Sequence, residues 1–380
     1  MNPLFNPLIE TLKHKNPKNL NMVIGFDGFV DEIIQVVDKR QDSHTFTRIK
    51  TIGQLAKRIE NASGLSTNIE LVSTVRKIGG NGPIMCNALA QHEPKITYIG
   101  ALGYPHIHDV FHEMTEHARL ITMADSGHTD ALEFLDGKLM LGKMTSLSDV
   151  NYTRLLDVLP ENELVKLIQE ADLFATVNWS MLPQMTDLWK NILTRILPQI
   201  PTRKNKPTFF VDLADPEKRE HHEIKEALHL LVSFKPHFRV VLGLNKKEAY
   251  DIASLYHLFA FDDLKAMTVS LENVNRALAE TLNLDGIVIH PVDRSSVFMN
   301  DIYVEHLGPL CENPKLTTGA GDNFNSGFVL GLLLDLDPGS SLLMGMATSG
   351  FYVRHARSPK WNELLAFLER WSNGKHDEAA

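Results

Sequence analysis

Short apolar runs alternate with amphipathic segments along most of the chain. Runs without polar interruption are typical of strands buried on both faces of a parallel sheet. Such runs lie at residues 22–26, 95–102, 173–177, 208–211, 239–244 and 286–289. Apolar residues recur with helical spacing at residues 161–170, 186–197, 221–232 and 270–282. This order predicts an α/β fold with a doubly wound, mainly parallel central sheet flanked by helices.

A second pattern predicts a separate small β-sheet. Residues 69–78 alternate between apolar and polar, as in a half-exposed strand, and residues 33–37 and 45–49 are predicted to join them. Residues 131–141 contain an Asp-Gly pair between two apolar stretches, which predicts a hairpin with a two-residue turn. The predicted division is an α/β core of residues 1–30, 79–127 and 146–380 and a small β unit of residues 31–78 and 128–145.

Polar residues follow several of the predicted core strands. They are Asp27, Asp31, Asp212, Asn245, Glu248 and His290. In open α/β sheets, ligands bind outside the carboxyl ends of the strands. We therefore expect a ligand site where these strands end.

Two glycine-rich segments precede predicted helices: Gly79-Gly80-Asn81-Gly82-Pro83 and Thr317-Thr318-Gly319-Ala320-Gly321-Asp322. Because Gly319 and Gly321 lack side chains, their backbone N–H groups can surround an anion at the start of a helix. An acid there repels a phosphate, so Asp322 fits best as a group that takes a proton from an attacking hydroxyl. The alternative is two plain turns, in which Asn81 caps one helix and Asp322 favours the dipole of the other.

Composition narrows the classes of function. The chain has 380 residues, a net charge of −9 and no basic block, so we expect no nucleic-acid partner. Two cysteines, Cys86 and Cys311, make no disulfide framework and fit a cytoplasmic location. We expect no membrane partner, because no apolar run is long enough to span a bilayer. No GxGxxG follows the first predicted strand, which disfavours a dinucleotide-dependent oxidoreductase.

With Gly79-Gly80-Asn81, Asn245-Lys246-Lys247-Glu248 and Thr318-Gly319-Ala320-Gly321-Asp322 in this order, the sequence resembles the ribokinase-like (PfkB) family of carbohydrate kinases. The resemblance runs from about Val23 to about Leu368. It implies a ribokinase-like fold in which the small sheet is a lid over the substrate. The implied reaction transfers the γ-phosphoryl group of ATP, bound with Mg²⁺, to a hydroxyl of a sugar or sugar phosphate. The family often dimerises through the lid, so a homodimer is expected.

The resemblance also implies a role for each site residue. Asp322 would be the general base, and the transferring phosphoryl group would lie against Gly319, Ala320 and Gly321. The substrate would contact Asp31, Gly80, Asn81 and Asp27. The residues on the nucleotide side would be Asn245, Glu248, Thr318 and His290. Of these, Glu248 and Asn245 would hold Mg²⁺ through water.

Several positions differ from the usual family pattern. Leu316 stands where the family usually has an acid near a monovalent-cation site, and residues 290–294 replace a Thr-x-Gly turn beside the nucleotide. Residues 79–87 resemble a pattern of the ADP-dependent sugar kinases instead. The alternatives are therefore ADP as donor, a nucleoside as acceptor, or a non-catalytic sugar- or nucleotide-binding regulator. Residues 317–322 favour ATP, and the presence of Asp322 favours an enzyme over a regulator.

Overall fold

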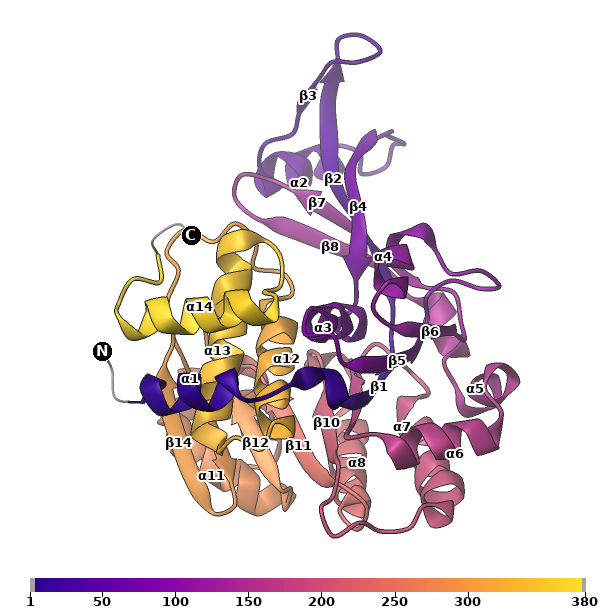
Figure 1. Cartoon of the computed structure of the whole chain (residues 1–380). Helices are drawn as coiled ribbons and strands as arrows, with labels where there is room; N and C mark the ends of the chain where they lie inside the picture. The colour runs from indigo at the N-terminus through magenta and orange to yellow at the C-terminus, as the bar shows by residue number, and fades with distance from the viewer. Residues whose placement is uncertain (1–3, 378–380) are drawn as a thin grey trace.

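The computed structural model describes residues 4–377 and contains a central sheet of nine strands (Figure 1). The strand order is β14-β13-β12-β11-β10-β9-β1-β5-β6. All neighbouring pairs are parallel except β12–β13 and β13–β14. The strands are β1 (Asn21–Phe26), β5 (Lys95–Gly100), β6 (Arg119–Thr122), β9 (Leu173–Val177), β10 (Thr208–Asp212), β11 (Arg239–Leu244), β12 (Gly286–Ile289), β13 (Arg294–Met299) and β14 (Ile302–Leu307). Residues 1–3 and 378–380 of the predicted core lie outside the described residues.

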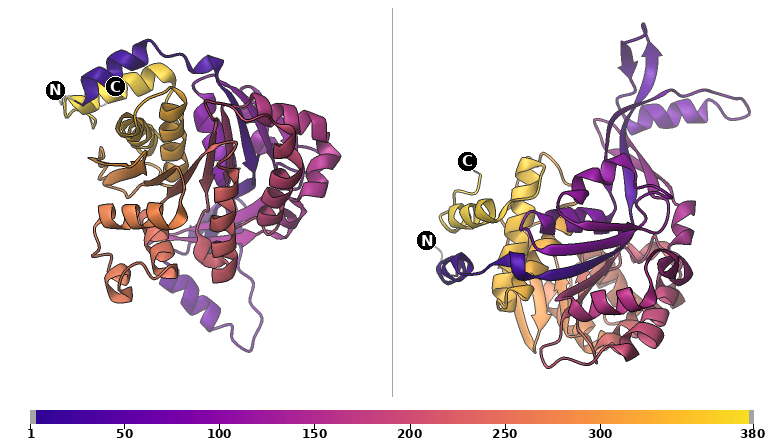
Figure 2. Two further views of the ribbon diagram at one scale, coloured as in Figure 1. Left: turned by 90° about the horizontal axis from the view of Figure 1, so that it is seen from below. Right: turned by 45° about the vertical axis from the view of Figure 1, so that its right-hand side comes forward.

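Helices cover both faces of this sheet (Figure 2). Successive strand residues alternate between two apolar cores, as Val23 and Ile24 do in β1. One core contains α1 (Phe5–Lys13), α3 (Asn81–Ala90), α4 (His112–Thr115), α12 (Ala320–Leu333), α13 (Pro338–His355) and α14 (Trp361–Ser372). The other contains α5 (Tyr152–Val158), α6 (Glu161–Glu170), α7 (Met185–Asn191), α8 (His221–Leu231), α9 (Lys246–Leu255), α10 (Phe261–Lys265) and α11 (Leu271–Leu282). The predicted doubly wound α/β fold is confirmed.

Two strands at one edge of the sheet were not predicted. β13 and β14 form an antiparallel hairpin in which Met299 pairs with Ile302. The two residues between them, Asn300 and Asp301, both have positive φ, 54° and 60°. Such a turn matches the twist of a hairpin, and asparagine and aspartate tolerate its backbone better than most residues. β6, at the opposite edge, was also not predicted.

The small sheet projects from the core beyond α3 (Figures 1 and 2). Its strands are β2 (Phe29–Arg40), β3 (Phe46–Arg48), β4 (Leu71–Gly79), β7 (Gly127–Glu133) and β8 (Lys138–Lys143). The helix α2 (Ile52–Glu60) packs on one face, where Leu55 meets Ile34, Val36 and Leu132. The opposite face carries Asp31, which is in register with Lys77 on β4 and Thr129 on β7.

The predicted hairpin is present as β7 and β8, but Asp136 and Gly137 are not its two-residue turn. Glu133 pairs with Lys138, so the loop between β7 and β8 has four residues, 134–137. The Phe134 N–H donates to the Gly137 carbonyl and closes this loop. No helix within residues 4–377 has the length and apolar character needed to cross a membrane.

Candidate active site

A tight turn leads the chain into α12. Gly319 has φ 89° and ψ 1°, and the Ala320 N–H donates to the Thr317 carbonyl at 3.0 Å. These are the features of a type II turn, which requires positive φ at its third residue. A methyl group on Gly319 would also lie 2.9 Å from the Tyr352 hydroxyl. Glycine at position 319 therefore meets both a backbone and a space requirement.

The start of α12 presents free hydrogen-bond donors. Within residues 4–377, the N–H groups of Gly319, Gly321 and Asp322 have no hydrogen-bond partner. The Ala320 N–H, predicted to act with them, is instead used in the turn. The helix dipole adds positive potential at the same end. The segment can therefore bind an anion, as the sequence predicts, through a slightly different set of donors.

Asp322 lies beside these donors and is 8% exposed. The Asn81 side-chain amide donates to Asp322 Oδ1 at 2.9 Å. This hydrogen bond joins residues that are 241 positions apart in the sequence. Burial raises the pKa of Asp322 well above its ordinary value, and the charge of Asp212 raises it further. The hydrogen bond from Asn81 opposes this shift. A buried carboxylate with a raised pKa is well suited to take a proton from a hydroxyl.

Asp27, at the end of β1, is fully buried and accepts four hydrogen bonds from the protein. Two come from the backbone N–H groups of Asn81 and Gly82, each at 2.9 Å. The third comes from the Asn178 amide at 2.8 Å, and the fourth from the Tyr98 hydroxyl, which lies 2.7 Å from the Asp27 backbone carbonyl and 3.3 Å from Oδ1. Burial raises the pKa of Asp27 to about 6, against these hydrogen bonds. Both oxygens of this fully buried carboxylate already accept hydrogen bonds from the protein, which disfavours direct contact with a sugar hydroxyl. Asp27 thus anchors the start of α3.

Asp31 occupies a different position, on the face of the small sheet nearest the core. It is 6% exposed, and its carboxyl lies against Gly79, where a methyl group would come within 2.3 Å of Oδ1. Burial raises the pKa of Asp31, whereas a hydrogen bond with Thr129 and the charge of Lys77 lower it. Gly80 follows Gly79 with φ 92° and is the N-cap residue of α3. Asp31 keeps unused acceptor positions and remains the better candidate for binding substrate.

Asn245 and Glu248 form a reciprocal cap at the start of α9. The Glu248 N–H donates to Asn245 Oδ1 at 2.9 Å, and the Asn245 N–H donates to Glu248 Oε2 at 2.9 Å. The Asp215 N–H donates to the other carboxylate oxygen at 2.8 Å. Burial, followed by the charge of Asp212, raises the pKa of Glu248 to about 7. The sequence spacing Asn-x-x-Glu therefore has a structural explanation of its own in addition to the predicted metal role.

Asp212, at the end of β10, was given no role from the sequence. It is 6% exposed and accepts from the Asn325 amide at 2.7 Å and from the Ala214 N–H at 2.8 Å. Burial raises its pKa to about 6. Its place at the end of a strand was visible in the sequence. Its contact with the first turns of α12, 113 positions away, was not.

The carboxylates around this site lack basic partners. No lysine, arginine or histidine within residues 4–377 forms an ion pair with Asp27, Asp212, Glu248 or Asp322. The same residues hold no group of three or more His, Cys, Asp or Glu placed to bind a metal ion directly. Mg²⁺ typically keeps several waters and binds to one or two carboxylates together with substrate phosphates. Asp212 and Glu248 fit that kind of site.

A cavity of about 380 Å³ opens beside the free donors of α12. Its lining includes Asn245, His290, Arg294, Thr317, Gly321 and Phe324. The His290 ring packs on Phe324 with the ring centres 4.8 Å apart, and burial lowers the pKa of His290 to about 4. Thr317 lines this cavity, whereas Thr318 lines a second cavity of about 390 Å³ with Leu316 and Lys77.

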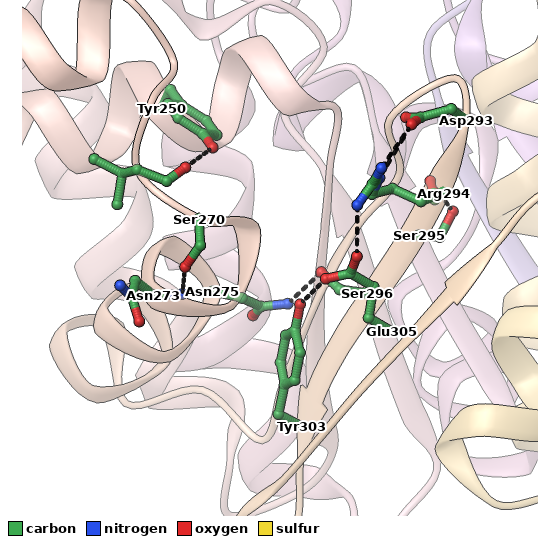
Figure 3. A network of polar contacts seen from close by, with 11 residues as sticks. Tyr250, Ser270, Asn273, Asn275, Asp293, Arg294, Ser295, Ser296, Tyr303 and Glu305 are labelled. Carbon is green, nitrogen blue, oxygen red and sulfur yellow. Dashed lines mark hydrogen bonds and ion pairs between the residues drawn. The ribbon is translucent and has the colours of Figure 1, made fainter.

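Polar contacts hold one wall of the first cavity (Figure 3). Arg294 donates to Asp293 at 3.0 Å and to Glu305 at 3.1 Å, and the Tyr303 hydroxyl also donates to Glu305. Nearby, Asn275 donates to Ser296 at 3.0 Å. β13, which the sequence did not predict, thus contributes Arg294 and Ser295 to the lining of this cavity, and β14 holds Arg294 through Glu305.

A sequence model of the prokaryotic ketohexokinase family matches residues 10–371. The chain belongs to this family. A ketohexokinase from Haloferax volcanii is 27% identical over 350 residues, which cover 91% of this chain and 90% of that protein. The predicted relationship to PfkB carbohydrate kinases is confirmed, and this family member is a phosphotransferase with an alcohol group as acceptor.

Solved structures share the fold of this kinase. Ribokinase from Arabidopsis thaliana, complexed with ribose and ATP, has a TM-score of 0.63 at 13% identity and covers 93% of this chain and 99% of its own. Adenosine kinase from Sinorhizobium meliloti has a TM-score of 0.62 at 15% identity, with the same coverage of 93% and 99%. At these identities the likeness shows the ribokinase-like fold alone.

Proposed function

We propose that this kinase transfers the γ-phosphoryl group of ATP to a hydroxyl of a ketohexose. The substrate class follows from the similarity to a ketohexokinase along most of both chains. The chemistry rests on one observation above all. The buried Asp322 lies beside three free backbone donors at a helix N-terminus, and the adjacent Gly321 lines a cavity of about 380 Å³.

In the proposed reaction, Asp322 takes the proton of the attacking sugar hydroxyl. The sugar oxygen forms a bond to the γ-phosphorus while the bond between that phosphorus and the oxygen bridging to the β-phosphate breaks. ADP carries away the electron pair of the broken bond. The N–H groups of Gly319, Gly321 and Asp322 would stabilise the negative charge on the phosphoryl oxygens.

Glu248, Asn245 and Asp212 would hold Mg²⁺ near the phosphates, partly through water. When it is bound, the ion would neutralise part of the negative charge on the phosphates. Burial raises the pKa of Asp212 and, together with the charge of Asp212, that of Glu248. A bound cation would favour the charged form of both carboxylates, which supports this proposal.

Asp31 would accept hydrogen bonds from sugar hydroxyls, with Gly80 and Asn81 alongside. We expect Asp31→Ala to raise the KM for the sugar at least about tenfold, while the KM for ATP changes far less. Steady-state kinetics with each substrate varied in turn would measure this. An equal rise in both KM values would remove Asp31 from the sugar site.

We also propose that the small sheet closes over the sugar and pairs with a second copy. Val75, Ile33, Ala131 and Met140 form one cross-strand row on the face that carries Asp31. Val75 and Met140 are 51% and 52% exposed, although both are apolar. A partner sheet would cover this row.

A phosphorylation screen tests the proposed function. Ketohexoses, aldohexoses, ribose, sugar phosphates and nucleosides would each be offered with ATP and with ADP. We expect turnover with a ketohexose and ATP, and none with Asp322→Asn in the same assay. Preference for ADP or for a nucleoside would replace the proposal with one of those alternatives. No transfer to any acceptor from either donor would overturn it.

A further inference from the structure

One side of α13 contacts the Gly319 turn through two hydroxyl groups. The Tyr352 hydroxyl donates to the Thr318 carbonyl at 2.8 Å, and the Ser349 hydroxyl donates to the Ala320 carbonyl at 2.9 Å. The two residues are one helical turn apart and face the same way. α13 therefore supports the turn from the flank of α12, beside which it packs (Figure 1).

The Tyr352 contact determines how one peptide plane is oriented. Type I and type II turns differ mainly by a half rotation of their central peptide, which here joins Thr318 to Gly319. In a planar trans peptide, the C=O and N–H groups point in opposite directions. Because Tyr352 holds the Thr318 carbonyl toward α13, the Gly319 N–H points away from α13. Rotation of this peptide would present an oxygen, which repels an anion, in place of the donor.

No other group shares this task with Tyr352. Within residues 4–377, Tyr352 is the only donor to the Thr318 carbonyl. The Ala320 carbonyl, which accepts from the Ser349 hydroxyl, belongs to the first turn of α12. Ser349 therefore supports the start of this helix and not the peptide between Thr318 and Gly319. Burial and the charge of Asp322 raise the pKa of Tyr352 to about 12, so the hydroxyl keeps its proton at neutral pH.

We propose that Tyr352, supported by Ser349, is a positioning residue that holds the Gly319 N–H in the orientation needed to bind the transferring phosphoryl group. This inference rests on the proposed function of the same site. Tyr352 would not touch either substrate. It would act through the turn, on the transition state more than on the bound substrates.

The variants Tyr352→Phe and Ser349→Ala test the proposal, because each removes a hydroxyl and little else. We expect Tyr352→Phe to lower kcat about 10- to 100-fold, a smaller loss than removal of an anion-binding donor causes, and Ser349→Ala to lower it less. The KM values and the affinity for ADP should change by less than about twofold. The extra affinity that ADP gains with aluminium fluoride, a mimic of the phosphoryl group, should fall as kcat falls.

Two matched controls remove comparable hydroxyls elsewhere. The Tyr250 hydroxyl donates to the Val269 carbonyl (Figure 3), and the Ser341 hydroxyl donates to the Asp337 carbonyl. Tyr250→Phe and Ser341→Ala should keep kcat and the aluminium fluoride effect of the wild type. Melting temperatures of all four variants would show whether each remains folded.

The outcomes separate this inference from the proposed function. Near-normal kcat and an unchanged aluminium fluoride effect in Tyr352→Phe would overturn the positioning role. A fall in kcat that is accompanied by a similar fold loss of ADP affinity and by a lower melting temperature would also overturn it. That pattern would indicate a purely structural role. If the wild type phosphorylates no sugar but Tyr352→Phe still loses the aluminium fluoride effect, the positioning role stands and the proposed function fails.

Discussion

At the scale of single residues, Asp322 combines two properties that a general base needs. It is buried beside the free N–H groups at the start of α12, and its pKa is raised by burial and by the charge of Asp212. The Asn81 amide holds Oδ1 in place, so the position of the acceptor is fixed before substrate binds.

We expect Asp322→Asn to lower kcat about 100- to 10,000-fold, because the amide cannot take a proton. The fold and nucleotide affinity should persist, since asparagine keeps an oxygen that can accept from Asn81. A coupled assay would give kcat, calorimetry the ADP affinity, and thermal unfolding the stability. A variant with near-normal turnover would show that another group is the base.

Glu248 permits a prediction about pH and stability. Its pKa in the folded protein is about 7, above its ordinary value of 4.5. The protonated form is therefore favoured by folding. That contribution is complete below about pH 4.5 and is lost as the pH rises through about 7.

Glu248→Gln should remove this dependence. Without divalent cations, the variant should gain stability relative to the wild type as the pH rises from about 4.5 to about 7.5, by about 1–3 kcal/mol. Urea unfolding at several pH values would measure the difference. Added Mg²⁺ with ADP should stabilise the wild type more than the variant. A difference that stays constant with pH would mean that Glu248 is charged throughout.

At the scale of elements, the Asp27 carboxylate links three parts of the core. It accepts from the first two N–H groups of α3 and from the Asn178 side chain after β9, and the Tyr98 hydroxyl on β5 donates to the backbone carbonyl of the same residue at 2.7 Å. Because Asn81 lies in this first turn of α3 and also donates to Asp322, the anchor extends to the proposed base.

Asp27→Asn should therefore affect both stability and catalysis. An amide brings two donors toward N–H groups that need an acceptor, which costs about 2–4 kcal/mol of folding free energy. We also expect kcat to fall at temperatures where the variant remains folded. Asp31→Asn is the matched control, since it should alter the sugar KM with a smaller effect on stability. Equal stability of both variants would contradict the anchoring role.

The sequence predicted some of these elements better than others. β11, β12 and α6 were placed at their observed bounds, because uninterrupted apolar runs and helical spacing are local signals. The β13–β14 hairpin was not, since Ser295 and Ser296 are buried polar residues that interrupt the apolar pattern. Contacts such as Asn81–Asp322 and Asn325–Asp212 depend on tertiary packing and have no local signal.

At the scale of the whole molecule, the small sheet has two faces with different surroundings. α2 and the cluster around Ile34 cover one face. The face that carries Asp31 leaves Val75 and Met140 half exposed. Because β4 and β8, which carry these residues, are the two edges of this part of the sheet, the two exposed side chains lie at its opposite edges, with Ile33 and the buried Ala131 between them.

Met140→Glu tests whether a second copy covers this row. Leu141→Glu is a matched control, because Leu141 is the next residue on β8, is 51% exposed and points to the opposite face. We expect light scattering to show a dimer for the wild type and for Leu141→Glu. Met140→Glu should weaken the dimer at least about tenfold, because a charge would be buried without a partner. A wild type that is monomeric at every concentration, or equal effects of both variants on the dimer, would contradict this arrangement.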